Sequence, residues 1–321
     1  MNADPSIAWR ILLTAGLEHA PDPAGLRAAL TSLHAAQGWP GDGLVLVDAD
    51  LAALRRHLGG LRAPVVAVGV AGPRLVVTAD HAAVDGLGLL SVLAALTGSP
   101  ATSSARGVGD RPDAAGPART VVRRLGEVAL APPARVRGTG GDVHADHDTY
   151  VETTVAGSPR TAHLIAASVR ALAGVGATRR VAVAVGVARD VDHERIADRS
   201  ALLRLRGAER LTPDEITALV RTAPTQAAPA AGGTGGAAVR LGLRVLAPRL
   251  GSTLLVSHLG TVTAPGVTSL AFHPVTAGGS GLSLGASTLG DATTLTLRAR
   301  ARSWGHDDLA RLLDRVVDAL A

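Results

Sequence analysis

The sequence of 321 residues contains no cysteine and no lysine, and only 2% of its residues are aromatic. The absence of cysteine excludes disulfide bonds, thiolate metal ligands and a cysteine nucleophile. Nucleic-acid binding relies on a clustered basic surface with aromatic stacking partners. Here the 32 arginines are scattered and the formal net charge is only +5, so we expect no nucleic-acid partner.

Long apolar runs are also missing. No stretch reaches the roughly 18 apolar residues of a membrane-spanning helix, so we expect no membrane span. Arg10 interrupts the first apolar segment and no basic region precedes it, which is not the pattern of a secretory signal peptide. We therefore expect a cytoplasmic protein. Hydrophobic residues make up 47% of the chain, enough for a sizeable core.

The hydrophobic patterning predicts strands and helices mixed along the chain. The expected strands are residues 7–17, Leu44–Val47, 65–70, 75–78, 151–155, 181–188, 202–205, 253–257, 268–272, 282–287 and 293–301. The expected helices start at Asp22, Leu51, Leu87, Val121, Thr161, Thr212 and Asp307. Because helices and strands do not alternate strictly, the pattern favours an α/β or α+β protein with mixed sheets.

Two segments rich in Gly, Pro, Ser and Asp, residues 99–117 and 132–147, are expected to be loops. They predict a division into an N-terminal half, residues 1–140, and a C-terminal half, residues 141–321. A late strand or loop of the second half is expected to reach back to the first. Residues 224–237, which contain the run GGTGG, are expected to form a linker.

The segment LVVTADHAAVDGLG, residues 75–88, is the most informative part of the sequence. A strand leads into Asp80 and His81, and Asp85-Gly86 precedes an apolar helix. Imidazole is well suited to take a proton near neutral pH, and Asp85 could orient the ring or brace the turn. Gly86 would allow a tight bend before the helix. The alternative is an ordinary strand-end histidine followed by a helix cap.

The run DHAAVDG resembles the HHxxxDG motif of the chloramphenicol acetyltransferase-like superfamily. This group includes nonribosomal peptide condensation domains, wax-ester synthases and polyketide-associated acyltransferases. Further segments resemble the family in the same order, namely the helix and strand of residues 161–189, the VSHLG run at 256–260 and the closing strands and helix. The resemblance covers most of the chain.

In the first half, the resemblance implies the following roles. His81 falls on the catalytic histidine of the motif and Gly86 on its glycine. Asp85 falls on the motif aspartate, which is mostly structural, and Arg189 is its candidate partner. Asp80 stands where the family has its first histidine, and we assign it to substrate binding.

In the second half, Ser257 falls near the cleft, where a hydroxyl could help to hold an oxyanion. His258 replaces the asparagine of the family's VSNLG segment and is expected to line the cleft. A segment like the family's DFGWG is missing, and the part before the motif is short for the family.

The resemblance implies two sandwich halves with mixed sheets and a cleft between them. It also implies an acyltransferase, in secondary metabolism or lipid modification, that moves an acyl group from a thioester to an alcohol or amine. The donor would be acyl-CoA or the phosphopantetheine of an acyl or peptidyl carrier protein, bound as a substrate, and no tightly bound cofactor or metal is expected. His81 would act as the general base.

Two alternatives remain open. The chain could be an inactive, condensation-like protein that binds a carrier protein, which the Asp80 replacement favours. It could also cyclise or dehydrate a carrier-bound chain with the same histidine. A metal site in the Asp- and His-rich residues 142–148 is conceivable, but a solvated linker fits these residues better.

Overall fold

The computed structural model describes residues 9–109, 111, 131–190, 196–225, 251–276 and 281–321. Its first sheet has the strand order β10-β1-β4-β3-β2. The bounds are β1 (Arg10–Leu17), β2 (Leu44–Val47), β3 (Val66–Ala71), β4 (Arg74–Asp80) and β10 (Val267–His273). Only the β2–β3 pairing is parallel, so the sheet is mixed.

The second sheet has the order β6-β12-β11-β9-β7-β8, and β5 pairs with β9. The bounds are β5 (Thr102–Ser103), β6 (Asp148–Ala156), β7 (Ala182–Ala188), β8 (Ser200–Arg206), β9 (Leu254–Thr263), β11 (Leu282–Leu289) and β12 (Ala292–Arg300). β9 runs parallel to β7 and β11, whereas the other pairings are antiparallel. The expectation of mixed sheets is confirmed.

The helices are α1 (Pro23–Gln37), α2 (Leu51–Gly60), α3 (Gly86–Thr97), α5 (Thr161–Ala173), α6 (Pro213–Thr222) and α8 (His306–Asp318), with a 3₁₀ turn at Ala208–Arg210. Local sequence sets their ends. Asp22 caps α1 by accepting hydrogen bonds from the next turn, and Gly38 ends it in the left-handed conformation. Thr212 and Glu215 form a reciprocal capping box at the start of α6.

Three apolar clusters hold these elements together. The second sheet packs against α5 and α8 in one core, and α2 covers one face of the first sheet in a small cluster. The other face of the first sheet packs against α1 and α3, and this core also contains Leu255 and Leu259 of β9. The two halves therefore share an apolar core.

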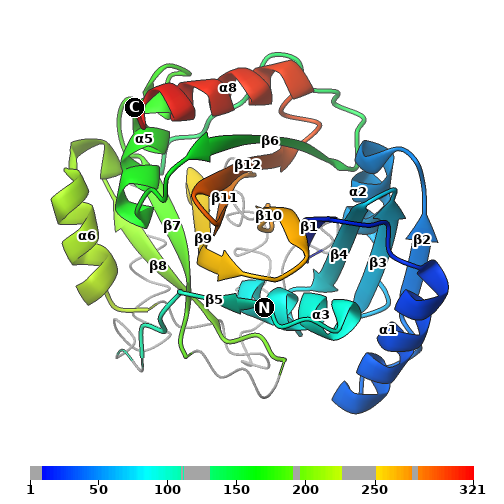
Figure 1. Ribbon diagram of the computed structural model, residues 1–321. Helices are drawn as coiled ribbons and strands as arrows, with labels where there is room; N and C mark the ends of the chain where they lie inside the picture. Colours follow the sequence, from blue (N-terminus) through cyan, green and yellow to red (C-terminus); the bar gives the residue numbers. More distant parts are fainter. Residues whose placement is uncertain (1–8, 110, 112–130, 191–195, 226–250, 277–280) are drawn as a thin grey trace, which may run out of the picture.

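Figure 1 shows the two sheets side by side, with β10 and β1 between them. β10 comes late in the chain but pairs antiparallel with β1, so a strand from the second half completes the first sheet. The division at residue 140 stays a prediction. The expected helix at residues 121–131 and the GGTGG run at 232–236 lie outside the described residues, apart from Ala131.

Candidate functional site

The motif residues form a short turn between β4 and α3. The Asp80 carboxylate accepts a hydrogen bond from the Ala82 N–H at 3.0 Å. The Asp80 carbonyl accepts two more, from the N–H groups of Ala83 and Val84. Asp80 therefore shapes the turn with both its side chain and its backbone. These hydrogen bonds give Asp80 a structural role in the turn. The substrate-binding role that we expected for Asp80 stays a prediction.

His81 is partly buried and is held at two points. Its backbone N–H donates to the Trp9 carbonyl at 2.7 Å, and its ring Nδ1 lies 3.2 Å from the Val84 carbonyl oxygen. A carbonyl oxygen can only accept, so Nδ1 must carry the proton in this contact. The lone pair of the neutral imidazole is then on Nε2. The turn thus selects the tautomer in which Nε2 is the base.

Asp85 is buried and caps α3. Its carboxylate accepts hydrogen bonds from the Gly88 N–H at 2.7 Å and from the Arg199 N–H at 3.1 Å. The first contact is a helix cap, and the second ties the motif to the other half. Burial raises the pKa of Asp85, and the hydrogen bonds from Gly88 and Arg199 oppose that rise.

The partner of Asp85 differs from the expectation. No hydrogen bond or ion pair within the described parts of the chain joins Asp85 to Arg189. Arg189 instead follows β7, where its N–H donates to the Arg199 carbonyl and its own carbonyl accepts from Gly109. The arginine that binds Asp85 is Arg199, and it does so through the backbone, which a side-chain motif cannot reveal.

Gly86 is required by close packing. A Cβ at this position would lie 2.9 Å from Cδ2 of Leu259 and 3.2 Å from Cζ of Phe272. Its backbone is not in the left-handed region that favours glycine. The physical reason for a glycine here is therefore the approach of α3 to β9 and β10, and not the tight bend that we expected.

Ser257 and His258 lie on opposite faces of β9 because neighbouring strand residues alternate. Ser257 shares its face with Leu255 and Leu259, which pack into the core beside α3. His258 shares its face with Val256, which packs under α5. Ser257 thus faces the first half, which is compatible with the expected position near the cleft.

His258 contacts the start of α5, and its expected place in the lining of the cleft stays a prediction. Its Nδ1 lies 3.2 Å from Oγ1 of Thr161, at the start of α5. Its Nε2 is buried without a hydrogen-bond partner among the described residues. Burial lowers the pKa of His258 to about 4, so the ring is neutral at physiological pH.

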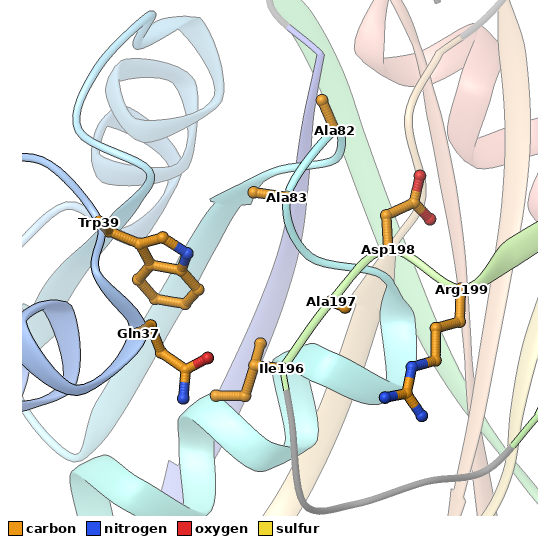
Figure 2. Close-up of a pocket in the computed structure, with 8 residues that line it drawn as sticks. All are labelled: Gln37, Trp39, Ala82, Ala83, Ile196, Ala197, Asp198 and Arg199. Atoms are coloured by element: carbon orange, nitrogen blue, oxygen red, sulfur yellow. The ribbon is translucent and has the colours of Figure 1, made fainter.

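A pocket opens beside the motif turn. Figure 2 shows its wall, with Gln37 and Trp39 on one side, Ile196–Arg199 on the other, and Ala82 and Ala83 of the turn above them. Its volume is about 520 Å³, within the range of small-molecule sites. Trp39 and Ile196 supply apolar surface, and Gln37 and Asp198 supply polar groups. Residues from both halves of the chain line the pocket, and Ala82 and Ala83, which follow His81 in the turn, are among them.

Two arginines near the site were missed in the sequence. Arg10 and Arg298 are each 1% exposed. Arg10 begins the mostly apolar strand β1, and Arg298 lies in β12 between Leu297 and Ala299. Arg10 donates to the carbonyls of Pro64, Val65 and Thr78 and to the Thr78 hydroxyl. Burial lowers the pKa of Arg10 to about 10, and the charge of Asp80 opposes that effect. The available signal was an arginine directly beside the apolar residues of a predicted strand.

The described residues contain neither a candidate metal site nor a candidate membrane-spanning helix. No group of three or more histidine, aspartate or glutamate side chains there could hold a metal ion. In residues 142–148, the Asp142 side chain accepts from the His144 N–H, and Asp148 pairs with two arginines. No described helix has the length and apolar character needed to cross a membrane.

Comparisons with known proteins identify the fold. No protein-family model and no curated protein matches the sequence. Solved structures match over nearly the whole chain. A variant of the starter condensation domain of rhizomide synthetase in complex with C8-CoA shares 14% identity with a TM-score of 0.57, over 98% of this chain and 89% of that chain.

Two further structures agree with this match. The epimerization domain from the third module of tyrocidine synthetase B shares 12% identity with a TM-score of 0.56, over 98% of this chain and 90% of that one. The condensation domain of Monacolin K polyketide synthase shares 12% identity with a TM-score of 0.53, over 99% and 92%. The chain thus has the condensation-domain fold, as the motif predicted.

Proposed function

We propose that this protein transfers an acyl group from a thioester to an alcohol or amine, with Nε2 of His81 as the general base. The observation that carries the proposal is the contact between Nδ1 of His81 and the Val84 carbonyl. It leaves the basic lone pair on Nε2 and holds the ring on a turn between two rigid elements. A positioned base of this kind contributes about 10²- to 10⁴-fold to rate.

The proposed reaction balances without a covalent enzyme intermediate. His81 Nε2 removes the proton of the acceptor O–H or N–H as that atom attacks the thioester carbonyl. A new C–O or C–N bond forms, and the carbonyl electrons move onto the oxygen. When they return, the C–S bond breaks, and the proton passes from Nε2 to the leaving thiolate. The products are an ester or amide and a free thiol.

The other site residues support this chemistry from around His81. Asp80 shapes the turn, and Asp85 fixes α3 behind it and ties it to Arg199. Ser257, on the face of β9 turned toward the first half, is the proposed hydrogen-bond donor to the oxyanion. The pocket lined by Trp39 and Ile196 has space for part of a substrate.

The donor is proposed to be acyl-CoA or an acylated phosphopantetheine on a carrier protein. One structure of the same fold contains C8-CoA, which supports an acyl thioester as the ligand class. At 14% identity that likeness shows the fold alone, so the donor must be tested on this chain.

A second candidate function is a carrier-protein-binding scaffold without catalysis. The observation that favours it is Asp80, which replaces the first histidine of the motif and whose carboxylate contacts the Ala82 N–H. Under this alternative, His81 would be an ordinary turn histidine. It differs from the first proposal in requiring no thiol release.

Thiol release tests the proposal. The purified chain is mixed with short, medium and long acyl-CoAs, with and without a panel of alcohols and amines, and the same acyl groups are offered on a carrier protein. Because the chain has no cysteine, it adds no background to a thiol reagent. Acceptor-dependent release that is lost in His81→Ala supports acyl transfer. Carrier-protein binding without release from any donor supports the scaffold.

A further inference from the structure

Arg298 of β12 lies between the two sheets, where its guanidinium is fixed by charge and by an aromatic ring. Its Nε donates to a carboxylate oxygen of Asp148 at 2.7 Å, and its Cζ lies 5.2 Å from the centre of the Tyr150 ring. Both partners are in β6, next to β12 in the second sheet. The guanidinium is therefore anchored in the second half.

The same side chain reaches the first sheet where a strand pairing stops. The β1–β10 ladder ends at the pair Leu12 and His273, and Pro274 has no N–H to continue it. Nη1 of Arg298 donates to the carbonyls of Arg10 at 2.6 Å and Pro274 at 3.2 Å, just beyond that end. One buried guanidinium thus joins the ends of β1 and β10 to β6.

The start of β1 in turn holds the motif turn. The Trp9 carbonyl accepts the backbone N–H of His81 at 2.7 Å. The Arg10 side chain donates to the Val65 carbonyl at 3.1 Å, and that carbonyl also accepts the N–H of Asp80. Neighbouring residues of β1 therefore connect Arg298 on one side with His81 and Asp80 on the other.

We propose that Arg298 is a positioning residue that holds the start of β1, and with it the His81 turn, at a fixed position against the second half. The contact is indirect, because Arg298 acts through the Arg10 carbonyl and not on a substrate. The consequence for activity rests on the proposed function of His81. The expected loosening of the His81 turn is independent of that function.

Arg55 of α2 provides a matched control. Its Nη2 lies 2.7 Å from Glu152 of β6, the same separation as in the Arg298–Asp148 pair. Its Nε donates to the Thr14 hydroxyl, so it also ties β1 to the second sheet. Thr14 lies further along β1 than Arg10, away from the end that contacts His81.

The test compares Arg298→Lys with Arg55→Lys in the full chain. Lysine keeps the positive charge but has one ammonium group, which cannot reproduce the planar fork of an arginine. Amide hydrogen exchange followed by NMR reports the His81 N–H, and the N–H of Thr253, which donates to the Ala182 carbonyl in the second half, is the reference. Acyl-transfer kinetics form a separate arm.

In Arg298→Lys we expect the His81 amide to exchange about tenfold faster relative to Thr253 than in the wild type. In Arg55→Lys the ratio should be unchanged. We expect kcat to fall about 10- to 100-fold in Arg298→Lys with KM nearly constant, since a small displacement of a catalytic group affects mainly the chemical step. The hydrogen-exchange measurement tests the position of the His81 turn even if the wild type transfers no acyl group.

An unchanged exchange ratio in Arg298→Lys would overturn the proposal, and so would an equal change in both variants. If Arg298→Lys does not fold, Asp148→Asn is judged by the same two outcomes, because it keeps the side-chain shape while weakening the anchor of Arg298.

Discussion

At the scale of single residues, one backbone carbonyl decides what His81 can do. Nδ1 of the ring faces the Val84 oxygen, an acceptor, and therefore holds the proton. Had the turn presented an N–H to Nδ1 instead, the lone pair would lie on that nitrogen and Nε2 would be a donor. The residues between Asp80 and Asp85 thus determine the chemistry through backbone geometry as much as through side chains.

This argument predicts the tautomer of His81. When the His81 ring is neutral, Nδ1 should show the nitrogen chemical shift of a protonated, pyrrole-like atom. Nε2 should show that of an unprotonated, pyridine-like atom. Nitrogen-15 NMR of a histidine-labelled sample measures both, and His81→Gln identifies the signals by their loss. A proton on Nε2 would contradict the proposed role of this atom as a base.

At the scale of elements, the absence of a side chain at Gly86 allows α3 to pack closely against β9 and β10. The helix begins at Gly86 against Leu259 of β9 and Phe272 of β10, so residues of both halves and both sheets meet at its first turn. Asp85 caps the same turn and accepts from Arg199. Residues of both halves therefore meet at the start of α3, which follows the His81 turn.

Gly86→Ala should destabilise the protein by about 1–3 kcal/mol, because the added methyl group must displace packed side chains. Urea unfolding measures the change. Gly60→Ala is the matched control, since Gly60 ends α2 and a Cβ there would meet nothing within 4 Å. We expect that control to be neutral or slightly stabilising. An equal loss of stability in both variants would disprove the packing argument.

Most elements could be predicted from the sequence because their signals are local. Asp22-Pro23 and Thr212 predict the starts of two helices. The spacing of apolar residues predicts the strands. The motif identified the turn and the fold. By contrast, the contact between Arg298 and Arg10 joins residues 288 positions apart, and the binding of Asp85 by the Arg199 backbone depends on how the halves meet. No local pattern encodes such register-dependent contacts.

At the scale of the whole molecule, a mostly buried polar cluster joins the two sheets beside the apolar core. Its members come from α2, β6, β10 and β12 and are Arg55, Asp148, Tyr150, Glu152, His273, Arg298 and Arg300. His273 is fully buried, with Nε2 3.6 Å from Glu152 and its ring edge-on to Tyr150. Burial lowers the pKa of His273 to about 4.

This cluster predicts a loss of stability in acid. Glu152 favours the charged form of His273, but burial and the charges of Arg55 and Arg298 oppose it, so the folded state binds the proton less readily than the unfolded chain. The stabilisation is present above the ordinary histidine pKa of about 6.5 and is lost as the pH falls toward 4. The contribution of His273 is about 3 kcal/mol.

Urea unfolding between pH 7 and pH 4 measures this effect. His273→Phe should show a shallower fall in the free energy of unfolding than the wild type. Tyr150→Phe should keep the wild-type slope, because the pKa of Tyr150 is raised to about 12 by burial and the phenol does not titrate in this range. A wild-type slope in His273→Phe would show that another group controls the acid response.

The most direct test of the account compares two histidines in the thiol-release assay with a productive donor and acceptor. His81→Gln should lower kcat by about 10²- to 10⁴-fold, the usual contribution of a general base. His258→Gln should retain most of the activity, because His258 contacts Thr161 under α5 on the opposite face of β9 from Ser257. Near-wild-type release by His81→Gln would contradict the proposal that His81 is the base.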